Sequence, residues 1–192
     1  IRITAKASTS PEARRLMEPM EHEVRSRLGD SVFGLDDETI ERVLLRLLSD
    51  LEYTIGTAES MTGGMVTARL TDLPGSSSVV KGGLVAYDAT LKQKLLGVGD
   101  IREVVNARTA IEVANGARDL LDVDVAVSVT GSAGPVALEK PVGTVFIGVA
   151  TPDDTRAGEL RWSGDRERVR TYATTAALQL TRLALIGKWW SA

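Results

Sequence analysis

Apolar residues follow two different periods along the chain, and these periods predict helices and strands. After a polar break at 34–39, apolar side chains recur at helical spacing: Ile40, Val43, Leu44, Leu47, Leu48 and Leu51. This stripe predicts an amphipathic helix whose apolar face packs against a core. Two continuous apolar runs, 123–129 and 143–150, predict buried central strands, whereas 155–162 alternates like a more exposed strand.

The rest of the chain continues this alternation. It predicts strands near 52–58 and within 79–88, and helices at 63–71, 91–96, 106–121 and from Asp165 through Ile186. Strands that alternate with helices favour a sheet covered by helices on both faces. We therefore expect an α/β protein, a three-layer α/β/α sandwich with a mixed, largely parallel sheet.

Residues 1–34 have a pattern of their own. We expect a strand at the start, a helix that begins near Pro11 and ends at Gly29, and a short strand at 32–34. A strand-helix-strand unit of this size cannot bury its apolar faces alone. The sequence therefore predicts two parts, with residues 1–34 as the remnant of a preceding linker domain and residues 36–192 as the main domain.

Composition narrows the class of protein. The 192 residues are 43% hydrophobic, which is enough for a core, and carry a net charge of −3 with 4% aromatic residues. This balance argues against a dedicated nucleic-acid surface. No apolar run reaches the roughly 18 residues that a membrane span needs, and no signal peptide is recognisable. A cytoplasmic protein without a membrane partner is expected.

The segment Thr57–Gly64, with the sequence TAESMTGG, carries the most informative chemistry. It joins a predicted strand to a predicted helix, a context that exposes the Ser60 hydroxyl and directs backbone N–H groups at whatever the hydroxyl attacks. Gly63 allows the backbone to approach a ligand closely, as does the glycine that follows it. The alternative interpretation is a helix start that is capped by Ser60 or Thr62.

The residue types that the chain lacks restrict the partner of such a serine. There is no cysteine, and the single histidine, His22, lies in the N-terminal segment. A Ser-His-Asp triad and a metal site rich in His or Cys are therefore not expected. A lysine with a lowered pKa is the remaining candidate base, and Lys81, Lys92 and Lys94 all stay open.

Other loops are candidates for the same site, because sites in open α/β sheets gather beyond the carboxyl ends of strands. Four loops are predicted to follow strands: 59–64, 74–78, 130–135 and 163–166. Arg166 and Arg170 lie one helical turn apart. They either clamp a phosphate or are solvated on an exposed helix.

Six motifs occur in an order that is typical of one family. They are residues 57–64, LPGSS at 73–77, GGLVAY at 82–87 with Lys92 and LLGV at 95–98, VTGSAGP at 129–135, KPVGTV at 140–145 and SGDR at 163–166. On these motifs, residues 36–188 resemble the C-terminal domain of the CinA family and its stand-alone PncC relatives. Residues 1–34 resemble the end of the linker domain that precedes it in full-length CinA.

The resemblance implies an amidohydrolase that converts nicotinamide mononucleotide to nicotinate mononucleotide and ammonia, in pyridine-nucleotide recycling. It implies Ser60 as the nucleophile, Lys92 as its base and Tyr87 as a residue that relays protons or orients Lys92. The N–H groups of Met61–Gly64 are expected to bind the oxyanion. Substrate-binding residues are expected at Glu59, Thr62, Gly63, Gly64, Ser76, Ser77, Thr130, Gly131, Ala133, Gly134, Arg166 and Arg170. The resemblance implies a homodimer and neither a metal nor an organic cofactor.

Several positions depart from the family pattern. Asp88 stands where a serine is common, and a carboxylate near Lys92 would favour the protonated amine. Asn106 also replaces a frequent serine. After Pro135 the link at 136–139 is shorter and more apolar than the usual Asp-Gly-Gly segment. These departures keep an alternative open: a CinA-like nucleotide-binding or assembly module, linked to competence or recombination, with weak or no deamidase activity.

Overall fold

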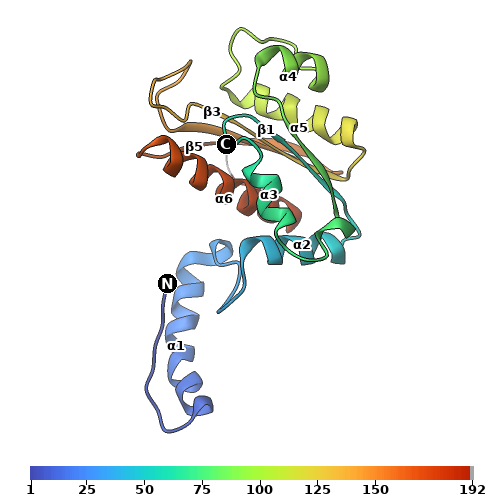
Figure 1. Ribbon diagram of the computed structural model, residues 1–192. Helices are drawn as coiled ribbons and strands as arrows, with labels where there is room; N and C mark the ends of the chain where they lie inside the picture. The colour runs from blue at the N-terminus through green and yellow to red at the C-terminus, as the bar shows by residue number, and fades with distance from the viewer. Residues whose placement is uncertain (191–192) are drawn as a thin grey trace. The chain divides into compact units, whose positions relative to one another are not determined.

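Five strands form one sheet in the part of the chain that follows Glu38 (Figure 1). In the computed structural model, which describes residues 1–190, the strand order is β2-β1-β3-β4-β5. The strands are β1 Ile55–Glu59, β2 Val80–Val85, β3 Val125–Gly131, β4 Thr144–Ala150 and β5 Thr155–Arg161. β1 is parallel to β2 and β3, whereas β3–β4 and β4–β5 are antiparallel pairs. Only β4 therefore runs against the other strands, and the expected mixed, largely parallel sheet is confirmed.

Helices cover both faces of this sheet. On one face α5 (Ala107–Leu121) packs across β1, β3, β4 and β5, and α4 (Ala89–Leu96) packs against α5. The other face carries α6 (Arg166–Leu185), α3 (Met65–Thr71) and α2 (Ile40–Asp50) (Figure 1). The three-layer sandwich is confirmed. Within residues 1–190 no helix combines the length and the apolar character that a membrane span requires.

The central strands are buried because helices cover them from both sides. Every residue of β3 and β4 is buried, which explains their continuous apolar sequence. Ser128 is a polar residue in this layer, and its hydroxyl donates to Ala110 O of α5 (2.6 Å) and accepts from Gly148 N (3.2 Å). A Cβ at position 148 would lie 2.3 Å from Ala110 O. Glycine at this position therefore lets α5 approach β4 closely.

Residues Ile1–Asp37 form a separate unit built on α1 (Ser10–Leu28) and the short 3-10 helix η1 (Gly29–Ser31). The helix was predicted correctly, but the strands expected at residues 1–6 and 32–34 are wrong, since neither segment is part of a strand. A strand needs a hydrogen-bonded neighbouring strand. Here Ile1 and Ile3 instead face a hollow that residues of α1 line.

Glu59, the last residue of β1, fixes the junction between β1 and α3. Its side chain is buried (1% exposed). One carboxylate oxygen accepts from Gly64 N (2.9 Å) and Val66 N (3.1 Å), and the other accepts from Thr67 N (2.9 Å) and Thr67 Oγ1 (2.8 Å). These are the N–H groups that the first turn of a helix leaves without a partner. The carboxylate therefore caps α3 and ties the helix to the sheet.

Replacing this carboxylate by its uncharged isostere is expected to destabilise the fold. In Glu59→Gln an NH₂ group meets buried donors, and two charge-assisted bonds are lost, at a cost of about 3 kcal/mol in the free energy of unfolding. The measurement is chemical denaturation. The exposed Glu159→Gln of β5 is the control, with an expected change within about 0.5 kcal/mol. Equal stabilities of the two variants would contradict the capping role.

Candidate active site

One cavity of about 550 Å³ opens at the carboxyl edge of β1 and β3. At this edge a parallel sheet collects loops from distant parts of the chain. Eight residues that the sequence predicted for the site line the cavity: Ser60, Tyr87, Lys92, Thr130, Gly131, Ala133, Gly134 and Arg166. The fold therefore brings together residues from four of the six motifs.

Ser60 lies on a tight turn directly after β1. Its N–H donates to Val129 O of β3 (3.0 Å), and its carbonyl accepts from Gly63 N (3.0 Å). Gly63 and Gly64 have φ angles of +64° and +97°, which side chains other than glycine rarely adopt. The two glycines therefore allow the chain to turn sharply between strand and helix, and Ser60 remains at the cavity wall.

Lys92 is the lysine that meets Ser60. Its amine lies 3.3 Å from Ser60 Oγ and donates to Tyr87 O at 3.1 Å. The Lys92 side chain is only 2% exposed, although it belongs to α4 near the protein surface. A serine hydroxyl and a buried amine within hydrogen-bond reach form a nucleophile–base pair in geometric terms.

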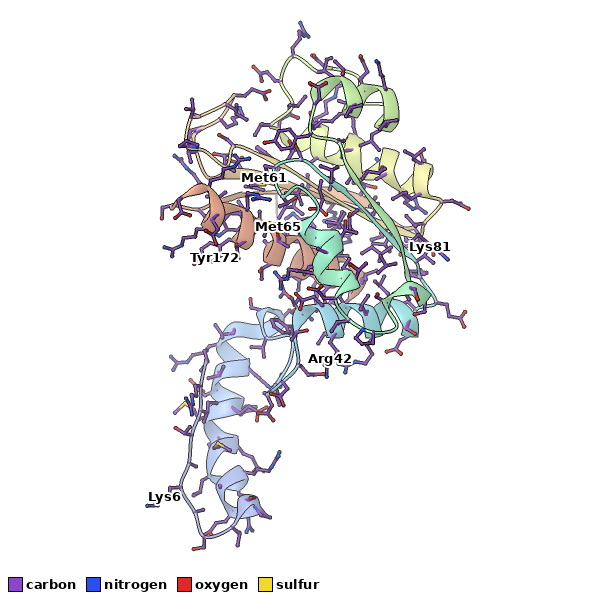
Figure 2. All side chains as sticks on the ribbon, in the orientation of Figure 1. Lys6, Arg42, Met61, Met65, Lys81 and Tyr172 are labelled. Atoms are coloured by element: carbon purple, nitrogen blue, oxygen red, sulfur yellow. The ribbon has the colours of Figure 1, made fainter. Side chains whose placement is uncertain are left out.

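The other two lysines that the sequence left open lie elsewhere. Lys94 is on the exposed face of α4. Lys81 is the second residue of β2, close to the amino edge of the parallel strands. Figure 2 shows Lys81 well separated from Met61, the residue that follows Ser60. The topology thus selects Lys92, a choice that composition could not make.

Burial lowers the pKa of Lys92, because the enclosed amine loses the water that stabilises its charge. Asp88 and then Glu139 oppose this shift, since each negative charge favours the protonated amine. Burial is the larger influence, so the pKa of Lys92 lies below the ordinary value of 10.5. The expected effect of Asp88 therefore has the right direction but does not dominate.

Asp88 has a structural role of its own, which explains why a carboxylate is accommodated there. It caps α4, with its Oδ1 accepting from Thr90 N at 2.8 Å. Asn106 does the same for α5, where its Oδ1 accepts from Thr109 N at 2.8 Å. Both departures from the family pattern are thus good helix caps.

Tyr87 and Arg166 form one side of the cavity. Arg166 donates through Nη2 to the Tyr87 hydroxyl (2.9 Å) and through Nη1 to Gly134 O (2.9 Å). The Tyr87 hydroxyl is therefore paired with Arg166, and Tyr87 contacts Lys92 through its carbonyl oxygen instead. A direct proton relay from the Tyr87 hydroxyl to Lys92 has no supporting hydrogen bond among the described residues.

Several residues that were expected to contact the substrate instead support the Ser60 turn through hydrogen bonds. Arg170 donates through Nε to Met61 O and through Nη2 to Thr62 O, both at 2.9 Å. This guanidinium is therefore bound to the turn rather than solvated on an exposed helix, and its contact with a phosphate stays a prediction. The cap interpretation of Ser60 and Thr62 is also wrong, because a carboxylate caps α3. The expected contacts that are absent from the cavity lining are Glu59, Thr62, Gly63, Gly64, Ser76, Ser77 and Arg170.

The prediction that the loop of Ser76 and Ser77 follows a strand is wrong, whereas their contact with substrate stays a prediction. The loop at 74–78 follows helix α3 and precedes β2, so it does not follow a strand. Its 3-10 helix η2 (Ser76–Ser78) lies at the amino edge of the parallel strands, next to the start of β2. Within this chain the two serines are therefore remote from Ser60, at the opposite edge of the sheet.

The sequence did not identify a second group of cavity residues. The loop before α5 contributes Val104 and Val105, and the link after Pro135 contributes Val136, Leu138 and Glu139. Thr130 Oγ1 donates to Val104 O (2.8 Å), which attaches the first of these loops to β3. The only signal in the sequence was the unusual composition of residues 136–139.

The structure thus defines an α/β protein with a serine–lysine site at the carboxyl edge of its sheet. Residues 37–185 match the sequence model of the CinA C-terminal domain, and the chain belongs to this family. Residues 1–34 match the model described as the KH domain of the damage-inducible protein CinA. The two matches meet where the structure divides into two units.

Full-length relatives are similar over nearly the whole chain. A CinA-like protein of Frankia casuarinae is 43% identical over 97% of this chain and 44% of its own length. A CinA-like protein of Dictyoglomus turgidum is 41% identical over 97% of this chain and 47% of its own length. The chain therefore spans somewhat less than half of these relatives.

Solved structures of the CinA superfamily have the same fold. The competence/damage inducible protein CihA from Agrobacterium tumefaciens is 34% identical with a TM-score of 0.70, over 80% of this chain and 99% of that chain. A CinA superfamily protein from Escherichia coli is 30% identical with a TM-score of 0.70, over 81% of this chain and 98% of that chain.

The burial of Lys92 predicts a pH dependence of stability. Between the lowered pKa of folded Lys92 and the ordinary 10.5, the unfolded chain binds a proton that the folded chain does not. The free energy of unfolding of the native chain should therefore rise with pH in this window relative to Lys92→Met, by at most about 1.4 kcal/mol per pH unit.

Chemical denaturation at several pH values measures this difference, with the exposed Lys94→Met as the control. If the difference in unfolding free energy between the native chain and Lys92→Met stays constant with pH, the folded and unfolded states titrate alike at position 92, which would contradict the prediction.

Proposed function

We propose that this chain hydrolyses the carboxamide of nicotinamide mononucleotide, releasing ammonia and nicotinate mononucleotide through a Ser–Lys mechanism. The observation that carries the proposal is the 3.3 Å separation of Ser60 Oγ and the buried Lys92 amine inside a cavity. Membership of the CinA family is consistent with it, although the names of the relatives state no enzymatic activity.

In the first half-reaction the neutral Lys92 amine takes the proton of the Ser60 hydroxyl as Oγ bonds to the carboxamide carbon. The C–O π electrons move to the carbonyl oxygen, which becomes the oxyanion of a tetrahedral intermediate. Burial supports this step, because it favours the amine over the ammonium ion. The turn presents Ser60 to the cavity without a large rearrangement.

The oxyanion needs N–H donors without other partners. Those of Gly63 and Gly64 are used, since they donate to Ser60 O and to the Glu59 carboxylate. Those of Met61 and Thr62 have no acceptor in the part of the chain that the structure describes. We assign the oxyanion to these two donors, each worth roughly 3 kcal/mol of transition-state stabilisation.

The intermediate collapses when the C–N bond breaks and the Lys92 ammonium gives its proton to the leaving nitrogen, which departs as ammonia. The nicotinyl ester on Ser60 is then hydrolysed by water, with Lys92 again as the base. Arg166 is the cavity cation available for the phosphate, and its bond to the Tyr87 hydroxyl holds the guanidinium in place.

Two substitutions test this assignment by ammonia release from nicotinamide mononucleotide. Ser60→Ala removes the nucleophile and Lys92→Met removes the base, so each should reduce kcat by at least about 1,000-fold. The matched controls are Ser49→Ala and Lys94→Met, which change an exposed serine and an exposed lysine and should retain activity.

The measurement should include binding as well as turnover. Ammonia release that persists in Ser60→Ala would refute the Ser–Lys mechanism. Tight nucleotide binding by the native chain without ammonia release would favour the alternative, a nucleotide-binding or assembly module.

A further inference from the structure

Glu139 is the single carboxylate among the cavity-lining residues that the structure describes. Its Oε2 accepts a hydrogen bond from Val105 N at 2.7 Å, which fixes the carboxylate at the cavity wall. No cation lies within ion-pair distance of it in residues 1–190. Glu139 is thus a positioned carboxylate that forms no close ion pair in the described residues, and it acts on the Lys92 amine only at longer range.

Both sides of this contact are held in place. On the side of Glu139, Leu138 N donates to Ser132 Oγ (3.2 Å), and Gly143 N donates to Ser132 O (2.7 Å). The link at 136–139 is thereby tied to the end of β3. A side chain on this short link has less freedom than one on a long polar loop.

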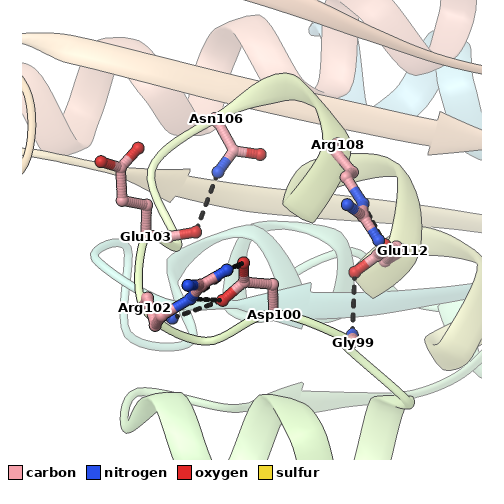
Figure 3. A network of polar contacts seen from close by, with 7 residues as sticks. All are labelled: Gly99, Asp100, Arg102, Glu103, Asn106, Arg108 and Glu112. Atoms are coloured by element: carbon pink, nitrogen blue, oxygen red, sulfur yellow. Dashed lines mark hydrogen bonds and ion pairs between the residues drawn. The ribbon is translucent and has the colours of Figure 1, made fainter.

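On the side of Val105, polar contacts brace the loop that leads into α5 (Figure 3). Asn106 caps α5 and donates to Glu103 O (2.9 Å). Figure 3 also shows the ion pairs Asp100–Arg102 (2.6 Å) and Arg108–Glu112 (2.7 Å). The carboxylates of these pairs are occupied by arginines, in contrast to Glu139.

The ionisable groups of the cavity differ in the charge that they present and in the partners that they have. Arg166 is the permanent cation and is paired with uncharged oxygens of Tyr87 and Gly134. Lys92 is kept toward its neutral form by burial, and Asp88 is engaged in capping α4. The cavity therefore has a permanent cation, Arg166, and a carboxylate, Glu139, on different wall segments, with the Lys92 amine as its third ionisable group besides Tyr87.

The proposed substrate has the complementary pattern, because its phosphate is negative and its pyridinium ring carries a fixed positive charge. We propose that Glu139 recognises the pyridinium charge and makes the cavity selective for cationic pyridinium carboxamides over the corresponding neutral rings. This inference rests on the proposed function. It concerns a residue on the link where this chain departs from the family pattern.

The test compares nicotinamide mononucleotide with its reduced form, which keeps the ribose, the phosphate and the carboxamide but has a neutral ring. Dissociation constants are measured by calorimetry in the Ser60→Ala background, where turnover cannot interfere. Adding Glu139→Gln retains an oxygen acceptor for Val105 N but removes the charge. Binding of the oxidised nucleotide should weaken about threefold to tenfold, and binding of the reduced nucleotide should not change.

Glu103→Gln is the control, since Glu103 lies on the neighbouring loop but does not line the cavity. It should leave both dissociation constants unchanged. Equal weakening of both nucleotides by Glu139→Gln would mean that the residue only supports the loop, and no weakening of either would remove it from recognition. Both results overturn the inference.

Ammonia release by the native chain separates this inference from the proposed function. If the native chain releases ammonia but Glu139→Gln leaves the preference for the oxidised over the reduced nucleotide unchanged, charge recognition is refuted. The deamidase assignment then remains intact. Absence of both ammonia release and nucleotide binding refutes the two proposals together.

Discussion

The site depends on the enclosure of one amine beside one hydroxyl. Removal of the Lys92 ammonium from water is costly, and the fold compensates with few contacts, namely Ser60 Oγ and Tyr87 O. The consequence is chemical, because a group that is costly to charge is a better base near neutral pH. Two carboxylates nearby reduce this effect without reversing it. Burial of an ionisable group thus exchanges some stability for a reactive pair.

The rest of the architecture keeps this pair in place. The Glu59 carboxylate, which directly precedes the turn, accepts hydrogen bonds from the start of α3. Arg170 of α6 donates to the two carbonyl oxygens that follow Ser60. The turn that carries Ser60 is therefore held from two helices on the same face of the sheet, whereas Lys92 arrives from α4 on the other face. The carboxyl edge of the parallel strands is the place where elements from both layers meet.

Much of the fold could be predicted because its signals are local. Continuous apolar runs predicted β3 and β4, and caps such as Asp165 marked helix starts.

The prediction of strands in residues 1–34 was wrong because strand pairing is not a local property of the sequence. Ser76 was misplaced because its loop was assigned to the wrong end of a strand. Lys92 was selected by family resemblance, and its burial required the structure. Arg170 supports the turn, and Glu139 is positioned at the cavity wall, through hydrogen bonds to residues more than thirty positions away. A short sequence pattern does not contain such long-range contacts.

The most direct test of this account is the titration of Lys92 itself. Nuclear magnetic resonance of protein with ¹³C-labelled lysine side chains follows each amine through its own titration, and the signal missing from Lys92→Met assigns the resonance. We expect Lys92 to titrate below 10.5. An ordinary or raised pKa for Lys92 would contradict the claim that burial prepares this amine as a base.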